Sequence, residues 1–566
     1  MMRTNVRKAL ALAAALLLAG TASACEDNGT ETDTLTPPLG VTATPLGTTA
    51  IRLTWNQVPS AEAYEVERAS GNGAFASVSA NVGGTFYEDT GLQPNTQYRY
   101  RVRALRSGRT SEYSAESIAT TGQEGPKVRT LQGFISASTT LFADSTYVLS
   151  GYVKVTNGAT LTIQPGTRLV GDTTVAGSSL WILRGSRIVA EGTAQAPIVF
   201  TSQRTAGNRR PGDWGGLIII GNAPINRTAN PILTEGPVGV AENYAGGGAF
   251  NDNSGSLRYV RIEFAGYDVS NGSGQELNSL SMYAVGRGSS IEFVQTMAGL
   301  DDSFEWFGGA VDGRFLVSYE SGDDHFDWTE GYRGRNQFLI ALQTAVLSPR
   351  TGAGTTSSDP RGFEGDGCES DKPGCTFANQ PYSQPVFANF TVIGPGAGVF
   401  SAQDGSGAVI RRGSGGTLVN GVIARWPGVG ISLRDQATGD LLAADSLTVR
   451  NVVLADNGAN FETAAAGRFG HLLANAAFNN VGTTGLAALL PGVPAAGAAP
   501  TTAGLDFSPA TASILATGGL NAFTGTAISG RVTGFFGGAL APTAYRGAAD
   551  PAGAKWWQGW TSYARN

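Results

Sequence analysis

The sequence has few of the residues that build most metal and nucleophilic sites. Its 566 residues include three cysteines, two histidines and only five lysines among 39 basic residues. His325 and His471 lie far in sequence from Cys368 and Cys375. Two cysteines alone cannot complete a zinc site. No Gly-x-Ser-x-Gly motif stands beside a histidine, which argues against a serine hydrolase triad.

Charged residues are also scarce, at 15% of the chain, and no basic run occurs. The formal charge is −6, and removal of residues 1–24, with three basic residues and no acid, makes it −9. A mildly acidic chain without a basic patch is a poor partner for nucleic acid. With 79 glycines and 41% hydrophobic residues, the composition favours an all-β protein of short strands and many turns.

The first 24 residues have the organisation of an export signal. Three basic residues precede an apolar stretch at 9–20 that is too short to span a bilayer. The next residues, Ala22-Ser23-Ala24-Cys25, resemble a bacterial lipobox, with Ala22 where leucine is usual. That resemblance implies a lipid on Cys25 and an outer-membrane or cell-surface lipoprotein, with residues 25–37 as a flexible tether. The alternative is ordinary cleavage after Ala24, which leaves Cys25 as a free thiol.

Cys368 and Cys375 enclose a short polar loop, and the rest of the chain offers them no other partner. Two cysteines without further ligands do not hold a metal. In the oxidising compartment that export implies, we expect them to close a small loop as a disulfide.

Residues 38–122 form a unit of their own. Segments 51–55 and 64–68 alternate apolar and polar residues, as half-buried strands do. Trp55, Tyr64 and the segment from Leu92 to Tyr98 resemble the second strand, third strand and tyrosine corner of fibronectin type III domains. The resemblance implies a β-sandwich, for which a spacer role is preferred over a binding role.

From about residue 126 the chain changes to short β runs separated by Gly, Asn and Asp, without convincing long helices. An acidic-aromatic block at 301–306 recurs 22 residues later at 323–328, and Asn389, Asn420 and Asn451 are 31 residues apart. These periods predict a parallel β-helix over 126–480, whose corner asparagines bond the coils above and below. The Ala- and Gly-rich residues 481–566 are expected to form loops and the cap of the solenoid end.

The repeated block contains the candidate metal site. On adjacent coils its aromatic residues stack about 4.8 Å apart, and alternation along the strand puts Ser303, His325 and the acids on the opposite, outer face. Stacked carboxylates repel, and hard oxygen ligands suit Ca²⁺. The candidate calcium ligands are Asp301, Asp302, Glu305, Asp323, Asp324 and Asp327, with Glu330, Glu364 and Asp366 as additional donors. The alternative is that the acids cap turns and are balanced by Arg333 and Arg335.

Several motifs of the second unit resemble a known group of proteins. These are the segments 212–217 and 259–266, both acidic-aromatic blocks, the segment 389–395 and the tryptophan-rich segment 556–561. They are similar to motifs of secreted right-handed β-helix proteins of Bacteroidetes-like bacteria, many of them surface lipoproteins. The resemblance covers nearly all of 126–566 and implies a right-handed parallel β-helix at the cell surface, without a settled activity.

Two functional classes follow. The first is a non-catalytic cell-surface lipoprotein whose β-helix binds extracellular glycans or surface proteins, with any calcium structural. The second is a calcium-dependent polysaccharide lyase or glycoside hydrolase, with Arg333 or Arg335 as the lyase base or an acid pair for hydrolysis. Trp214 and Trp556–Trp560 are candidate sugar-stacking residues, and His325 a candidate acid–base group. The first class is favoured, because carboxylate pairs arise readily in an acidic β-helix.

Overall fold

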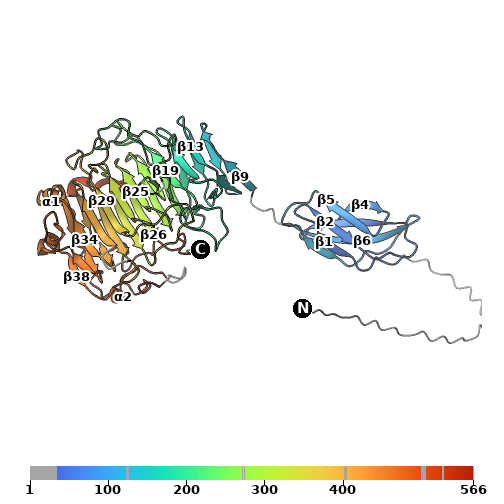
Figure 1. Cartoon of the computed structure of the whole chain (residues 1–566). Helices are drawn as coiled ribbons and strands as arrows, with labels where there is room; N and C mark the ends of the chain where they lie inside the picture. The colour runs from blue at the N-terminus through green and yellow to red at the C-terminus, as the bar shows by residue number, and fades with distance from the viewer. Residues whose placement is uncertain are drawn as a thin grey trace, which may run out of the picture. The chain divides into compact units, whose positions relative to one another are not determined.

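The computed structural model describes residues 35–122, 127–270, 272, 274–400, 405–498, 505–524 and 528–564. The chain divides into two compact units, Met1–Gly125 and Pro126–Asn566 (Figure 1). Both are built almost entirely of strands, which confirms the all-β prediction. The expected signal at 1–24, Cys25 and most of the expected tether lie outside the described residues.

The first unit is an antiparallel β-sandwich. One sheet has the order β1-β2-β5, and the other has the order β4-β3-β6-β7, with β8 paired to β6. Trp55, Tyr64 and Tyr98 are buried in its core, and the Tyr98 hydroxyl accepts a hydrogen bond from the Gln93 N–H at 3.0 Å. The expected tyrosine corner is therefore present. The strands are β1 (Thr42–Pro45), β2 (Ala50–Thr54), β3 (Ala63–Ser70), β4 (Ala76–Val82), β5 (Phe86–Thr90), β6 (Gln97–Arg106), β7 (Arg109–Thr110) and β8 (Ser117–Thr120).

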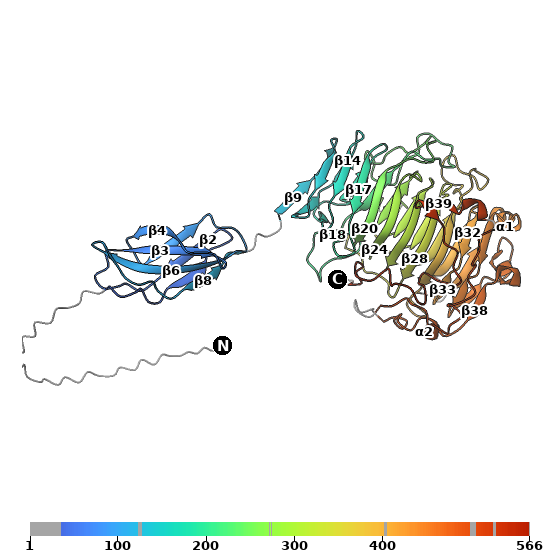
Figure 2. The same cartoon turned by 180° about the vertical axis from the view of Figure 1, so that it is seen from behind.

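The second unit is a parallel β-helix, in which successive coils add strands to two long sheets (Figures 1 and 2). Among the described residues, the seventeen-stranded sheet contains β9 (Lys127–Leu131), β11 (Thr139–Leu141), β12 (Ser145–Leu149), β14 (Thr160–Ile163), β15 (Arg168–Gly171), β17 (Arg187–Glu191), β18 (Ile198–Ser202), β20 (Gly255–Glu263), β24 (Ser290–Met297), β26 (Asp312–Tyr319), β28 (Arg335–Leu342), β30 (Val386–Ile393), β32 (Gly416–Val419), β33 (Val422–Ala424), β35 (Leu447–Arg450), β36 (Val453–Ala455) and β38 (Val481–Thr483).

The eleven-stranded sheet carries the candidate metal site. Its described strands are β10 (Phe134–Ile135), β13 (Tyr152–Val155), β16 (Ser179–Ile182), β19 (Gly216–Ile220), β23 (Leu280–Tyr283), β25 (Phe304–Phe307), β27 (Phe326–Thr329), β29 (Arg361–Asp366), β31 (Ser406–Arg411), β34 (Val429–Leu433) and β37 (Ala459–Phe461). The loops carry the short strands β21 (Tyr267–Asp268), β22 (Glu276–Leu277), β39 (Thr533–Phe535) and β40 (Gly538–Ala539), and the short helices α1 (Gln436–Ala443), α2 (Leu486–Leu489), η1 (Gly470–Ala474), η2 (Ala476–Phe478) and η3 (Ser529–Arg531).

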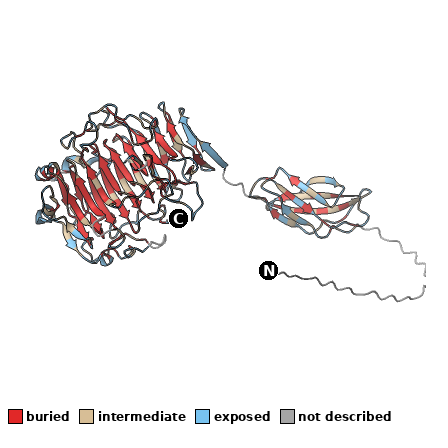
Figure 3. Ribbon diagram, in the orientation of Figure 1, coloured by how far each residue is buried: buried red, intermediate tan, exposed pale blue. Residues whose placement is uncertain are grey.

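The core of the β-helix lies between these sheets, where strand after strand is buried (Figure 3). The predicted register of the repeated block is confirmed, because Phe304 pairs with Phe326, Glu305 with Asp327 and Trp306 with Trp328. The aromatic residues face the core, and the Phe304 and Phe326 rings stack with centroids 5.5 Å apart. The aromatic half of the block is thus part of the core.

The longest strands of the seventeen-stranded sheet bend in the middle, where one residue per coil has a left-handed backbone. These residues are Tyr259, Phe293, Phe315, Phe338, Asn389, Asn420 and Asn451, with φ between 48° and 63°. Asparagine tolerates this region better than most residues, so the 31-residue period marks a real corner of the coil. The predicted bonding to a neighbouring coil occurs at Asn389, whose Oδ1 accepts from Gln337 Nε2 at 3.1 Å, but the side-chain amide groups of Asn420 and Asn451 bond elsewhere. Asn420 Nδ2 donates to Thr543 Oγ1 at 3.1 Å and Asn451 Nδ2 to the Gly518 carbonyl at 2.9 Å, both in the C-terminal segment.

The C-terminal segment, described at 505–524 and 528–564, lies along the coils instead of only covering the last one. Its Trp560 ring packs edge-on against Phe293 at 6.1 Å, and the Ser562 carbonyl accepts a hydrogen bond from Gln295 at 2.7 Å. The expectation of a terminal cap is corrected accordingly.

Candidate functional site

The candidate site lies on the face of the eleven-stranded sheet that points away from the aromatic core. Glu305 on β25, Asp327 on β27 and Glu364 on β29 occupy one row across three successive coils. Asp301 and Asp302 precede β25, and Asp323 and Asp324 precede β27. The structure therefore brings all six predicted calcium ligands to two neighbouring coils.

Most of these carboxylates are covered, whereas the sequence analysis placed them on an outer face. Asp302, Glu305 and Asp327 are each less than 10% exposed, and Asp301 and Asp323 are intermediate. Loops of the β-helix lie over the sheet here, including the segment 226–244 and the disulfide loop. A polymer cannot reach the inner oxygens of this cluster.

The prediction that Ser303 and His325 face outward was wrong. Both are fully buried, and the Ser318 hydroxyl lies 2.7 Å from Ser303 Oγ and 2.6 Å from His325 Nδ1. The coil turns a corner just before each strand, so simple alternation fails at these positions. Burial lowers the pKa of His325 to about 3, so the imidazole is neutral at neutral pH, and its side chain has no exposed surface.

A side-chain to backbone ladder explains two of the acids. The Asp302 N–H donates to Asn278 Oδ1 at 3.1 Å, and the Asp324 N–H donates to Asp302 Oδ1 at 2.8 Å. The Arg361 N–H continues the ladder by donating to Asp324 Oδ1 at 2.5 Å. Asn278 also donates to Glu305. The expected turn-capping role therefore holds for one oxygen of Asp302 and one of Asp324.

The remaining oxygens form a cluster that meets the distance requirement of a cation site. Asp301, Asp302 and Asp323 offer oxygens that all lie within 4.8 Å of one another, and the same is true of Asp302, Glu305 and Asp327. The two groups share Asp302. Oxygens at this spacing surround a centre that Ca²⁺ reaches at roughly 2.3–2.6 Å. Asp324 belongs to neither group, so the predicted ligand set contracts from six residues to five.

Among the described residues the cluster has no direct ion-pair partner, and the charges of Arg361 and Lys372 act on Asp323 and Glu305 only from beyond ion-pair distance. In the described part of the chain, no lysine or arginine lies within ion-pair distance of any of the five carboxylates. Asp323 Oδ1 and Asp327 Oδ1 are buried without a hydrogen-bond partner. Burial, followed by repulsion from Glu364 and Asp366, raises the pKa of Asp327 well above its usual value, and burial raises that of Asp323 to about 7. Unpaired buried carboxylates are costly, and a bound cation removes that cost.

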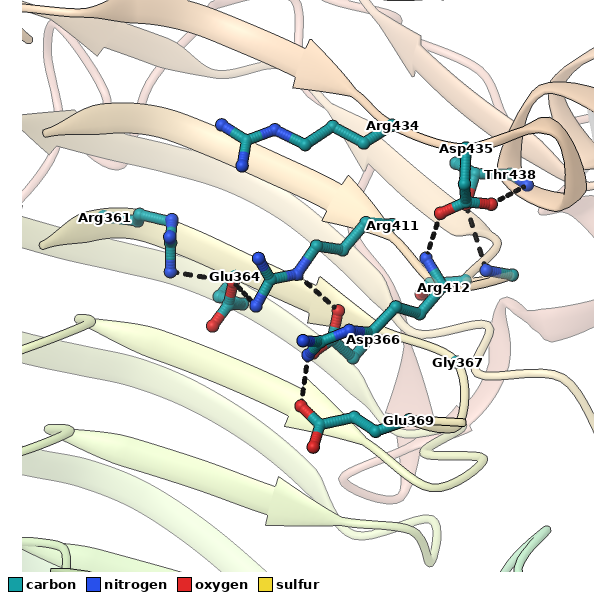
Figure 4. A network of polar contacts seen from close by, with 12 residues as sticks. Arg361, Glu364, Asp366, Gly367, Glu369, Arg411, Arg412, Arg434, Asp435 and Thr438 are labelled. Carbon is teal, nitrogen blue, oxygen red and sulfur yellow. Dashed lines mark hydrogen bonds and ion pairs between the residues drawn. The ribbon is translucent and has the colours of Figure 1, made fainter. Parts of the chain in front are cut away.

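The next coils solve the same problem with arginine (Figure 4). Arg411 lies between Glu364 and Asp366, at 2.6 Å and 3.0 Å. Arg361 pairs with Glu364 at 2.8 Å and with Asp324 at 3.4 Å, and Arg412 pairs with Asp366. Glu364 and Asp366, which were expected as additional calcium donors, are instead ion-paired with these arginines.

The basic residues expected to balance the acids lie elsewhere. Arg335 is buried in the seventeen-stranded sheet, where it pairs with Asp312 and donates to the Thr533 carbonyl at 2.7 Å. The Arg333 carbonyl accepts from Arg531 on that same side. Glu330, another expected donor, pairs with Arg227 at 2.9 Å. Neither predicted lyase base is beside the carboxylate cluster.

The predicted disulfide between Cys368 and Cys375 is present, with Cα atoms 5.2 Å apart. Its loop carries Lys372, which pairs with Glu369 at 3.2 Å and lines a cavity of about 220 Å³ together with Glu235 and Glu330. Burial raises the pKa of Glu235 to about 7. Sequence reasoning missed Lys372 and Glu235 because loops of irregular length bring them to the cluster.

Of the candidate sugar-stacking aromatics, only Trp556 is partly exposed. Trp214, Trp557 and Trp560 are each at most 1% exposed, so they serve the core and the C-terminal packing. A more open groove of about 600 Å³ lies further along the same sheet, at β34 and β37. Arg434, Arg468 and Glu462 line it, and Arg434 projects from the network without an ion pair to the residues drawn in Figure 4.

Comparisons with known proteins agree with the two-unit architecture. A family model described as a pectate-lyase-like β-helix domain matches residues 133–488, and a fibronectin type III model matches residues 36–120. In the described residues, no helix has the length and apolar character needed to cross a membrane.

Solved structures of fibronectin type III-like domains are similar to a short part of this chain. The crystal structure of FN3tt is 24% identical over 16% of this chain and 97% of its own, with a TM-score of 0.15. An Fn3-like protein from Clostridium thermocellum is 32% identical over 16% of this chain and 94% of its own, with a TM-score of 0.14. Titin domains A168–A170 are 24% identical over 16% of this chain and 33% of their own, with a TM-score of 0.15.

Proposed function

The chain belongs to the pectate-lyase-like β-helix domain family, and from this premise we propose that it is a non-catalytic, calcium-stabilised binding scaffold. In this proposal the protein is exported and anchored through a lipid on Cys25. The fibronectin type III domain is a spacer, and the β-helix presents a surface to extracellular glycans or surface proteins. The single observation that carries the calcium assignment is the five-carboxylate cluster with buried, unpartnered oxygens on Asp323 and Asp327.

The burial of the cluster favours a structural calcium over a catalytic one. A lyase needs its metal, its base and the substrate carbon within contact of one another. Asp302, Glu305 and Asp327 are nearly inaccessible, and the nearest arginine, Arg361, already pairs with three carboxylates. A calcium ion here therefore acts by holding two coils together.

Binding is assigned to the more open groove of about 600 Å³ at Arg434, Arg468 and Glu462. Its size is within the range of small-molecule and glycan sites. Glu462 accepts hydrogen bonds from the backbone of Leu433 and Gly470, at 2.8 Å and 2.9 Å, and is thereby held in place. It is not positioned as half of a free hydrolytic pair.

Calcium binding is tested by thermal melting of the chelator-treated protein with and without calcium. Saturating calcium should raise the melting temperature by about 3 °C, which corresponds to ligand at roughly 100 times its dissociation constant. Asp302→Asn/Asp327→Asn should abolish the shift, because Asn retains the hydrogen-bond acceptor of Asp302 but not the charge. Asp144→Asn, at an exposed surface pair, is the control and should retain the shift. No calcium shift in the wild type would sink the metal assignment.

Absence of catalysis is tested separately with acidic and neutral polysaccharides. The protein with calcium should release no unsaturated product and no reducing ends, while a glycan array should report binding that Arg434→Met weakens. Release of unsaturated sugar would instead establish the lyase alternative.

A further inference from the structure

A second cavity, of about 400 Å³, lies at another corner of the β-helix and is separate from the carboxylate cluster. It is lined by Gly396, Ala397, Arg425, Asp456, Leu486, Ala487, Leu490, Val493, Pro494, Ala495 and Ala496. Most of these side chains are apolar, and the cavity lies between the coils that end in β33 and β36 and the segment around α2. Arg425 is the one basic residue in its lining.

Arg425 is placed there by the stacking of the coils. It follows β33 directly and has a left-handed backbone with φ 61°, as does Asp456 after β36 with φ 55°. The Arg425 N–H donates to the Ala455 carbonyl at 2.9 Å, which fixes the backbone at the corner. The residue is 8% exposed, so its guanidinium is held inside the structure.

The guanidinium is only partly satisfied. Nη1 donates to the Pro494 carbonyl at 2.5 Å, whereas Nε and Nη2 are buried without a hydrogen-bond partner. Asp456 is the acid in the lining, and its oxygens accept from the Gly485 and Leu486 N–H groups at 2.8 Å and 2.7 Å. Those bonds commit Asp456 to the start of α2.

An ionised group with two open donors is costly to bury, and the cost falls when an acceptor reaches it. Burial lowers the pKa of Arg425 to about 10, so the side chain is charged at neutral pH. Nε and Nη2 lie on one edge of the planar guanidinium, and such an edge binds the two oxygens of a carboxylate side by side.

The rest of the cavity requires an apolar ligand body. Leu486, Leu490 and Val493 are buried and belong to the second hydrophobic core. A sugar acid would leave its hydroxyl groups without partners against these side chains, while an alkyl or aryl group is buried favourably.

We propose that this cavity binds a small amphipathic carboxylate, with its carboxylate at the Arg425 guanidinium and its apolar part against Leu486, Leu490 and Val493. The Nε–Nη2 edge is closed off in the structure, and in this proposal the guanidinium turns that edge toward the ligand on binding. The cavity volume is in the range of small-ligand sites. The site is independent of calcium and of the groove at Arg434.

Isothermal titration calorimetry with sodium octanoate tests the proposal on the full-length protein. Octanoate should bind at one site, and hexanoate, shorter by two methylenes, should bind roughly fifteenfold more weakly, because each buried methylene contributes about fourfold in affinity. Octanamide, which has the same chain and a neutral head, should also bind at least tenfold more weakly than octanoate.

Three variants separate the contribution of the Arg425 charge to binding from effects on folding. Arg425→Met should lower octanoate affinity at least tenfold, whereas Arg434→Met, in the groove on the other sheet, should leave it unchanged. Arg425→Lys provides a charged variant without the bidentate edge and should show intermediate affinity. If Arg425→Met unfolds the protein, the comparison of octanoate with octanamide on the wild type still shows whether binding depends on the carboxylate charge. Absence of octanoate binding at millimolar concentration, or equal binding of octanamide, overturns the proposal.

Discussion

The outer face of the eleven-stranded sheet carries carboxylates on neighbouring coils in two electrostatic settings. On the β25 and β27 coils, Asp301, Asp302, Glu305, Asp323 and Asp327 cluster without a basic partner. On the β29 and β31 coils, Glu364 and Asp366 are ion-paired with Arg361, Arg411 and Arg412. The residue types and strand register are alike, so the difference lies in the source of the countercharge.

The comparison shows how one scaffold manages buried acids in two ways. An arginine side chain is part of the protein, so it supplies a permanent positive charge and occupies the place that a bound cation would take. A cluster without arginine depends on the surroundings for a cation, which couples the stability of those coils to the calcium concentration. The boundary between the two settings lies at Asp324, which follows Asp323 of the cluster in sequence but pairs with Arg361.

Arg361→Met should have the largest effect, because it strands Asp324 and Glu364 without their shared partner. We expect a loss of about 3–5 kcal/mol in the free energy of unfolding of the β-helix, as for one-sided removal of a buried ion pair. Denaturant unfolding measures it. Arg258→Met removes a more exposed arginine that pairs with Glu292 and should cost about 0–1 kcal/mol. Similar losses in both variants would erase the distinction between the two settings.

Removal of a single charge should have opposite signs in the two settings. In calcium-free buffer, Asp327→Asn should stabilise the protein by an amount on the order of 1 kcal/mol, because it relieves repulsion at an oxygen without a partner. Asp366→Asn should destabilise it by about 1–3 kcal/mol, because it weakens two arginine contacts. Chemical unfolding measures both changes in the free energy of unfolding. If both substitutions changed it in the same direction, the carboxylates of the cluster would not be repelling one another.

The pH dependence should give the smallest effect, as a difference between two melting curves. The folded-state pKa of Asp323 is raised from 3.8 to about 7, so the folded state binds more protons than the unfolded state between these values. The stability of the calcium-free protein therefore falls as pH rises from about 4 to 7. Calcium should raise the melting temperature more at pH 7.5 than at pH 4.5. An equal shift at both pH values would contradict the assignment of calcium to these carboxylates.

The sequence predicted those parts of the fold that repeat locally. The 22-residue period and the alternation within the strand were enough to place Phe304 over Phe326 and Glu305 over Asp327, because coil stacking fixes both. The cysteine pair was predicted by its isolation. The same alternation failed at Ser303 and His325, where the coil turns and periodicity carries no information about direction.

Long-range partners could not be predicted from one sequence. The asparagine period located a corner, but the partners of Asn420 and Asn451 come from a segment about 70–120 residues away, without a repeat of its own. Arg361 begins β29 and Lys372 lies in the disulfide loop, and both follow connections whose paths no local pattern describes. The predicted partners, Arg333 and Arg335, were nearer in sequence but belong to another sheet.

The C-terminal segment has a consequence for cooperativity. A stack of coils in which each touches only its neighbours can fray from one end, coil by coil. Here Trp560 accepts from Arg261 at 3.3 Å, and Gly518 accepts from Asn451 at 2.9 Å, so one segment joins coils far apart in the stack. Opening any intermediate coil disturbs the segment that holds the others. The β-helix should therefore melt in a single transition, and deletion of residues 518–566 should divide that transition into steps.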